Sequence, residues 1–329
     1  MDGMSIGPLE MTDSCLSETV VPTQTATAGP CQHTLRRSIC GIGIGLHTGQ
    51  RISLSLSPAP VNTGIIFRRT DLDGYMIPAT YDHVIDTRLS TVIGVPAQGA
   101  ATRVATIEHL MAALSGCGID NAYIDLDGPE VPVFDGSASE FMFLLDCAGR
   151  APQAAPRATL EILRTVRVED GDAFAELCPP TTDGLNISMS IEFAAQAIGR
   201  QIFSAQVSAS SFRRDLENCR TFTLRQEIDA LHAAGLARGG SLENAIVVDD
   251  DRILNPTGLR RPDEFVRHKV VDVIGDLYLC GAVIHGDFHG HKSGHTLNNR
   301  LLRALMANPS AWRLHGHVPQ KRQIGRAAA

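Results

Sequence analysis

The chain has 329 residues, enough for about two domains with buried cores, which excludes a peptide hormone or a disulfide-rich miniprotein. Hydrophobic residues make up 43% and charged residues 20%, a balance typical of a globular protein, and no apolar run is long enough to span a bilayer. With 29 Lys and Arg against 36 Asp and Glu, the net charge of −7 would repel nucleic acid, which we exclude as a partner.

The eight cysteines are scattered and form no Cys-x-x-Cys pair, so we predict reduced thiols in a cytoplasmic protein. Residues 1–30 contain four acids, no Lys or Arg and no apolar run. This fits neither a secretory signal nor a transit peptide, and we expect a disordered leader.

The first ordered pattern is the period-two alternation of Arg51–Ser57, which predicts a half-buried strand. The glycine-rich segment 41–49 before it does not follow Gly-x-Gly-x-x-Gly and leads into a strand, so we interpret it as a tight turn with His47 and Thr48 at its tip. Further strands are predicted at 63–68, 122–127, 173–177, 185–193 and 245–248, and helices at 106–115, 139–147 and 263–280.

Strands outnumber helices and come in runs, which favours an α+β fold over a doubly wound parallel sheet. The Ala- and Pro-rich segment 149–157 lacks periodicity and predicts an interdomain linker. We therefore expect an N-terminal α+β domain at 31–150, a C-terminal α+β domain at 151–318 and a frayed tail at 319–329. Each domain would hold a sheet packed against helices, with the active site at their interface.

The strongest chemical signal lies in the helix predicted at 263–280, where His268, Asp272 and Asp276 are spaced i, i+4, i+8. Such a column can bind a metal with its first two groups and use the third to orient a neighbour. The alternative is a solvated helix face that carries a simple charge pair.

A second signal is the segment 106–116, in which Thr106 can cap a short helix and Gly116 can end it. Adjacent helical side chains diverge by roughly 100°, so if His109 bound a metal, Glu108 would face the nucleophilic water as a general base. Alternatively, Glu108 only complements the helix dipole beside an incidental histidine.

The segment His285–His295 holds four histidines among Gly and Lys and reads as a loop. It could be a second metal site, a mobile catalytic loop or simply a solvated one.

Together these segments resemble one family, the zinc-dependent UDP-3-O-acyl-N-acetylglucosamine deacetylases, from about Thr34 to Leu305. The resemblance is carried by Gly-Leu-His-Thr-Gly at 45–49, Asn-Thr-Gly at 62–64 with Arg-Arg-Thr-Asp at 68–71, Thr-Ile-Glu-His-Leu at 106–110, Pro-Val-Phe-Asp-Gly-Ser at 132–137, Arg-Thr-Phe at 220–222, Phe-Val-Arg-His-Lys at 265–269 and Lys-Ser-Gly-His at 292–295.

The resemblance implies Zn²⁺ as cofactor, held by His109, His268 and Asp272. Two imidazoles and one carboxylate leave an open fourth position, as in catalytic rather than structural zinc sites. By the same resemblance, Glu108 is the general base.

The resemblance also implies that His295 is protonated, stabilises the oxyanion and donates to the leaving amine, while Asp276 holds it. Thr221 would add a hydrogen bond to the oxyanion.

For the substrate, the resemblance implies contacts from Lys269 and Lys292 to the diphosphate and from Phe222 to the substrate, with Arg267 adding to a local positive patch. It further implies an apolar passage for the acyl chain within 227–245. Its candidate lining residues, for which ordinary core packing remains the alternative, are Ile228, Ala237, Leu242 and Ala245.

The implied reaction is hydrolysis of the acetamide of UDP-3-O-acyl-N-acetylglucosamine to acetate and the free 2-amine, the committed step of lipid A biosynthesis in Gram-negative bacteria. We expect a cytoplasmic monomer whose partner is this small-molecule UDP-sugar, without integral membrane association. Two alternatives stay open: a zinc amidohydrolase acting on another nucleotide sugar or amide, and a non-enzymatic protein that binds a metal or a nucleotide sugar.

Overall fold

The structure is a computed structural model that describes residues 30–95 and 102–316. The predicted leader, apart from Pro30, and the predicted tail lie outside the described residues.

Strands and helices follow one another in an irregular order along the chain. The helices are α1 (Glu108–Cys117), α2 (Ser139–Ala148), α3 (Ala209–Asp215), α4 (Arg225–Ala233), α5 (Glu264–Tyr278) and α6 (His295–Met306). The strands are β1 (Cys31–Leu35), β2 (Ile39–Ile44), β3 (Arg51–Pro58), β4 (Ile65–Arg69), β5 (Tyr75–Pro78), β6 (Val84–Asp86), β7 (Val92–Gly94), β8 (Arg103–Val104), β9 (Ala122–Leu126), β10 (Arg150–Pro156), β11 (Thr159–Ile162), β12 (Val166–Asp170), β13 (Ala173–Cys178), β14 (Leu185–Glu192), β15 (Arg200–Val207), β16 (Phe222–Leu224), β17 (Ile246–Asp249), β18 (Arg252–Ile253), β19 (Val283–His291) and β20 (Trp312–His315).

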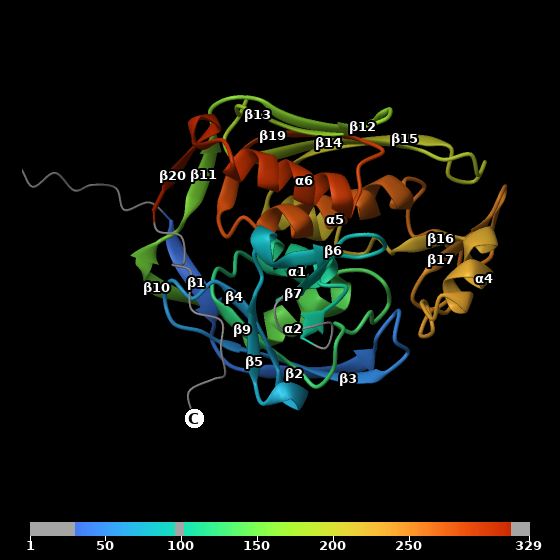
Figure 1. The fold of residues 1–329 in the computed structure, drawn as a ribbon, viewed down its shortest axis with the longest axis horizontal. Coiled ribbons are helices and arrows are strands. Elements are labelled where there is room, and N and C mark those ends of the chain that lie inside the picture. Colours follow the sequence, from blue (N-terminus) through green and yellow to red (C-terminus); the bar gives the residue numbers. More distant parts are fainter. Residues whose placement is uncertain (1–29, 96–101, 317–329) are drawn as a thin grey trace, which may run out of the picture.

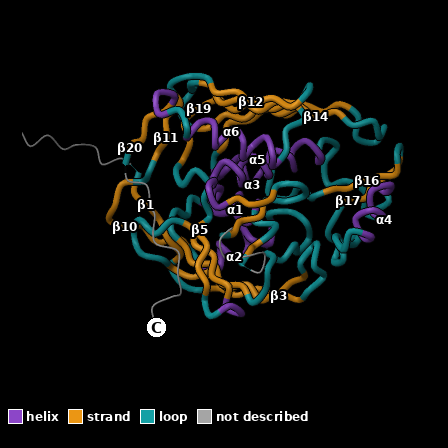
Figure 2. The backbone as a smooth tube through the Cα atoms, viewed as in Figure 1, coloured by secondary structure: helices purple, strands orange, loops and turns teal. Residues whose placement is uncertain are grey.

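Two sheets enclose a central layer of helices (Figure 1). One sheet has the order β2-β3-β9-β4-β5, and the other has the order β12-β13-β19-β11-β20 with β14 and β15 joined through β19. The helices α1, α2, α5 and α6 lie between them, as Figure 2 shows in purple between the orange strands. Strands in runs with helices on one face of each sheet confirm the α+β prediction.

The alternation in β3 explains why its sheet can pack on the helices. Ile52, Leu54 and Leu56 are almost completely buried, while Ser53 and Ser55 point to the other face. Since successive strand residues point to opposite faces, one apolar row is enough to fix the sheet on the helices.

The histidine-rich segment predicted as a loop is instead mostly β19, the strand that joins the parts of the second sheet. Gly286 and Gly290 weaken the strand pattern in the sequence, because glycine is more typical of loops. A side chain at Gly286 would crowd Ile162, and one at Gly290 would crowd Met189, so close packing requires glycine at both positions.

Two further segments for which the sequence predicts no strand also contain one. The predicted linker is largely β10, which pairs with β1, and a two-stranded ribbon tolerates the prolines that weakened the strand signal. Within 41–49, the first half is β2, and only Gly45–Gly49 forms the turn. Gly41 and Gly43 leave room there for Leu144 and Phe134.

The helix predicted at 106–115 is α1, but its ends differ from the prediction. Thr106 does not cap it and has a φ of 58°, and the helix ends at Gly118, whose φ is 67°. Gly116 instead makes room for the ring of Phe212.

Helix α1 crosses α5 at Gly275, where a Cβ atom would overlap the backbone carbonyl of Glu108. Only glycine allows this approach. The crossing therefore places the first turn of α1 directly beside the polar column of α5.

We expect Gly275→Ala to destabilise the fold by about 1–3 kcal/mol through overpacking, although alanine normally favours a helix interior by about 1 kcal/mol over glycine. Urea unfolding of both proteins measures the change. Gly294→Ala is the control, because a methyl group there meets no atom within 4 Å. An equal or higher stability for Gly275→Ala would contradict the close crossing.

Candidate active site

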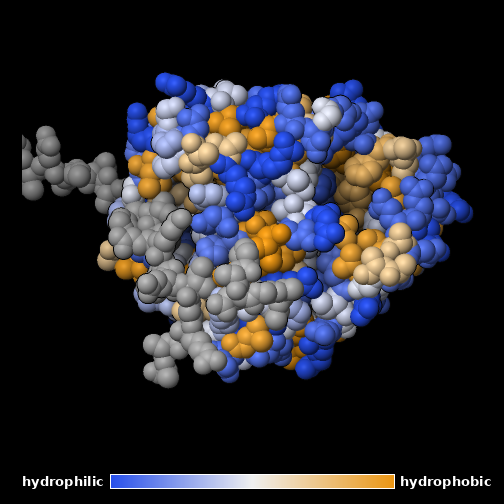
Figure 3. Space-filling view, in the orientation of Figure 1, coloured by the Kyte–Doolittle hydropathy of each residue, from blue (hydrophilic) through white to orange (hydrophobic). Residues whose placement is uncertain are grey.

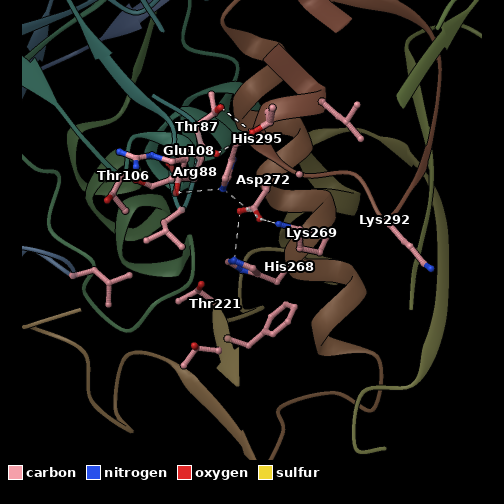
Figure 4. A pocket seen from close by; sticks show the side chains of 18 of the residues that line it. Thr87, Arg88, Thr106, Glu108, Thr221, His268, Lys269, Asp272, Lys292 and His295 are labelled. Atoms are coloured by element: carbon pink, nitrogen blue, oxygen red, sulfur yellow. Dashed lines mark hydrogen bonds and ion pairs between the residues drawn. The ribbon is translucent and has the colours of Figure 1, made fainter. Parts of the chain in front are cut away.

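A cavity of about 430 Å³ in the described part of the chain opens beside the N-terminal ends of α1 and α6 and the middle of α5. Glu108 and His109 reach it from α1, His268 and Asp272 from α5, and His295 is the first residue of α6. Figure 4 shows Glu108, His268, Asp272 and His295 directed toward one another across it.

The three predicted metal ligands lie together and are buried. The ligand atoms of His109, His268 and Asp272 are within 4.8 Å of one another, the one such grouping found among the described residues. Asp272 Oδ1 lies 3.6 Å from His109 Nε2 and 3.4 Å from His268 Nε2. The solvated-face alternative for α5 is wrong, because His268 and Asp272 are only 3% and 2% exposed.

The chemistry of these atoms fits a divalent metal. Asp272 Oδ1 is buried and makes no hydrogen bond within the described residues, while Oδ2 accepts one from Lys269 Nζ at 2.7 Å. His268 Nδ1 donates to the carbonyl of Cys219 at 3.1 Å, which leaves its Nε2 lone pair free for a metal. Burial also lowers the pKa of His268 to about 4, which keeps the imidazole neutral.

Glu108 lies beside this cluster with one carboxylate oxygen bound and the other directed into the site. Oε2 accepts the backbone N–H of Thr91 at 3.0 Å, and Oε1 lies 3.8 Å from His295 Nε2. Burial raises the pKa of Glu108, although His295 and His109 oppose that effect. A carboxylate with a raised pKa can accept a proton near neutral pH.

The third group of the column, Asp276, orients His295. His295 Nδ1 donates to Asp276 Oδ2 at 2.8 Å, and Asn298 and Thr91 donate to the same carboxylate. Burial alone would lower the pKa of His295, but the carboxylates of Asp276 and Glu108 raise it to about 9. The imidazole is therefore a cation with its Nε2–H free to donate.

Thr221 and Phe222 line the opposite wall of the cavity at the start of β16. The two predicted phosphate contacts also line it, but both ammonium groups already have carboxylate partners. Lys269 is bound by Asp272, and Lys292 by Asp172 at 2.7 Å. In Figure 4 the Lys292 side chain points away from the cluster.

Arg267 is not among the residues lining the cavity, since its guanidinium binds Asp263 and stacks on Phe203. The structure therefore does not bring it into the positive patch expected from the sequence.

The four candidates for the acyl passage lie around the projection formed by α4 and the loop that follows it, whose surface mixes apolar and polar residues (Figure 3). The residues lining the cavity do not include any of them; the apolar lining there comes from other residues such as Leu46, Phe193 and Leu224. Ala245 is buried, Leu242 is 42% exposed, Ile228 is half-buried, and Ala237 has a φ of 51°.

Thr91 is a residue that the sequence did not single out. Its N–H binds Glu108, and its hydroxyl donates to Asp276 at 2.5 Å. A lone threonine after a loop carries no pattern that indicates this role. Nor did the sequence reveal helix α6, which delivers His295.

None of the helices in residues 30–95 and 102–316 has the length and apolar character needed to cross a bilayer.

Comparison with known proteins relates this chain to one group. A family model described as LpxC, UDP-3-O-acyl N-acetylglycosamine deacetylase, matches residues 32–307. UDP-3-O-acyl-N-acetylglucosamine deacetylase from Acidithiobacillus ferrooxidans is 51% identical over 284 residues, which cover 85% of this chain and 91% of the relative. The proteins of the same name from Phenylobacterium zucineum and Shewanella sp. ANA-3 are 50% and 48% identical, each over 86% of this chain and over 96% and 92% of their own lengths.

We expect a divalent metal to stabilise the protein, because the three ligand atoms come together only in the folded state. A metal at a hundred times its Kd should add about 2.7 kcal/mol. Thermal melts of the chelated protein with and without added zinc measure this gain. Asp272→Ala should abolish it, whereas His291→Ala, a strand histidine bound to Ser190, should keep it. A full gain in Asp272→Ala would contradict the ligand set.

Proposed function

The chain belongs to the UDP-3-O-acyl-N-acetylglucosamine deacetylase family, and we propose that it carries out this reaction with a zinc ion held by His109, His268 and Asp272. It is an amide hydrolase that removes the acetyl group of UDP-3-O-acyl-N-acetylglucosamine in lipid A synthesis. The observation that supports the proposed zinc site best is the buried Asp272 Oδ1, which has no hydrogen bond within the described residues and faces two imidazole nitrogens.

When bound, zinc would polarise the acetamide carbonyl and make water a nucleophile at neutral pH. Glu108 takes the proton from the attacking water through the oxygen that Thr91 leaves free. Formation of the new C–O bond places the negative charge on the former carbonyl oxygen. When the carbonyl reforms, the C–N bond breaks, and the nitrogen needs a proton to leave as an amine. His295 supplies it from Nε2 while Asp276 holds the other ring nitrogen. Thr221 offers a hydroxyl to the oxyanion from the opposite wall.

Substrate contacts form the second part of the proposal. We assign the diphosphate to Lys269 and Lys292, which would exchange their carboxylate partners for phosphate oxygens. Phe222 contacts the substrate beside His268, whose ring centre is 6.3 Å away.

The acyl chain would follow the apolar wall from Leu46 and Leu224 toward the α4 projection. Ile228 lies one residue beyond Glu227, which lines the cavity. Ala237, Leu242 and Ala245 remain candidates for its outer part.

The division into domains at 31–150 and 151–318 with the site between them, the monomeric state and the cytoplasmic location also remain proposals. The seven described cysteines are all free thiols, which supports a reducing compartment.

The direct test is acetate release from UDP-3-O-acyl-N-acetylglucosamine by purified protein, before and after chelation and after zinc is restored. We expect turnover that chelation abolishes and zinc restores. Turnover that persists in the fully chelated protein would contradict the proposed zinc mechanism.

We expect Glu108→Gln to keep zinc and lose about 10²- to 10⁴-fold in kcat, because the amide cannot take a proton while the three metal ligands remain. Zinc content by mass spectrometry and kcat, measured on one sample, check this. Wild-type turnover by the zinc-loaded variant would assign the base elsewhere.

We expect Asp276→Asn to move the alkaline limb of the pH–rate profile to lower pH by about one unit or more. The asparagine oxygen still accepts from His295 Nδ1, but it no longer stabilises the imidazolium, so the acid loses its proton earlier as pH rises. The profile of kcat/KM measures the shift. Asp287→Asn, which changes a buried carboxylate outside the cavity lining, is the control. An unmoved limb in Asp276→Asn would remove His295 from the role of acid.

A further inference from the structure

Glu130 carries a buried carboxylate that none of the roles above uses. Its side chain is 0% exposed and does not line the cavity, so it cannot touch the substrate. It nevertheless lies directly behind the cavity wall, because its hydrogen-bond donors belong to two segments that do line it.

The two oxygens of Glu130 bind different groups of neutral donors. Oε1 accepts the backbone N–H of His47 at 2.8 Å and the hydroxyl of Thr106 at 3.0 Å. Oε2 accepts both the backbone N–H and the hydroxyl of Thr48, at 2.9 and 2.8 Å. One oxygen thus joins the turn at Gly45–Gly49 to the segment that leads into α1.

The structure makes room for this carboxylate. A side chain at Gly45 would overlap Glu130 Oε2 and the Thr48 hydroxyl. The loop after α4 rests on the same turn, where Gly239 N–H donates to the carbonyl of Leu46 at 3.0 Å. The position of the turn therefore affects Leu46 and His47, which both line the cavity, and the loop beside them.

The other segment bound by Glu130 is under strain. Thr106 is a β-branched residue with a φ of 58°, a left-handed conformation that such residues rarely adopt. It lies two residues before Glu108, so its conformation sets how the chain enters the first turn of α1. The bond from its hydroxyl to Glu130 helps to hold that conformation.

We propose that Glu130 is a positioning residue, which fixes the Leu46–His47 wall of the cavity relative to the end of α1 that carries Glu108 and His109. The inference rests on the proposed function of that site. Three of its four bonds hold the turn, so its loss mainly displaces the wall that the substrate meets.

The test is Glu130→Gln, compared with wild type at saturating zinc. Whichever oxygen the amide NH₂ replaces, it then faces the backbone N–H of His47 or of Thr48, neither of which can accept a hydrogen bond, so the turn must move. We expect kcat/KM to fall at least tenfold, mostly through a higher KM, with zinc content unchanged. A role in stability alone would lower the folded fraction and leave the KM of the folded enzyme as in wild type.

Two variants of Thr106 test the same bridge from the other side and do not depend on the folding of Glu130→Gln. Thr106→Val removes the hydroxyl and keeps the shape, so it should raise KM severalfold. Thr106→Ser keeps the hydroxyl and should lose far less. Combined with Glu130→Gln, Thr106→Val should lose less than the sum of the two single losses, since both changes act on the same bridge.

Asp287→Asn is the matched control, since Asp287 also accepts a backbone N–H, from Thr181, at a buried position outside the cavity lining. It should lower the melting temperature without changing KM. A wild-type KM in Glu130→Gln, or equal losses in Thr106→Val and Thr106→Ser, would overturn the inference. Failure of the wild-type protein to release acetate would instead count against the proposed function itself.

Discussion

The site depends on one backbone contact, the crossing of α1 over α5 at Gly275. Because the carbonyl of Glu108 rests against a residue without a side chain, the first turn of α1 comes within ligand distance of the column on α5. Neither helix holds a complete site alone. In the proposed site, α5 supplies two metal ligands and the partner of the acid, and α1 supplies the third ligand and the base. The two sheets pack on the helix layer from both sides, so the same packing forms the core and the site.

This packing buries several ionisable groups in a small volume, which is favourable only when each has a partner. Lys269 meets one oxygen of Asp272 at 2.7 Å, and His295 meets Asp276 at 2.8 Å. The remaining oxygen of Asp272 lies 3.4 Å from the Nε2 of His268 but makes no hydrogen bond within the described residues. The buried charges are thus paired by short contacts except at the atoms that we propose as metal ligands.

The sequence predicted those parts of the site that lie within one element. The four-residue spacing of α5 correctly indicated a common face, since it depends only on helix geometry. The sequence failed where the relevant contact is tertiary. The glycines of β19 led to the prediction of a loop, because the residues that they pack against, Ile162 and Met189, are far away in the chain. Thr91 and Glu130 were missed for the same reason, and the strain at Thr106 is set by its surroundings.

The separation between the base and the acid affects how the enzyme returns to its starting state. In the proposed reaction each turnover would leave an extra proton on Glu108 and remove one from His295, but Oε1 and Nε2 are 3.8 Å apart, beyond direct hydrogen-bond distance. Thr91 binds both Glu108 and the carboxylate that holds His295, and these bonds favour the positions described. At that separation the proposed proton return would use an intervening molecule, such as a water that enters after the amine has left. The return of both groups to their starting protonation states would thus depend on departure of the amine product. An amine that leaves slowly would also delay the next turnover.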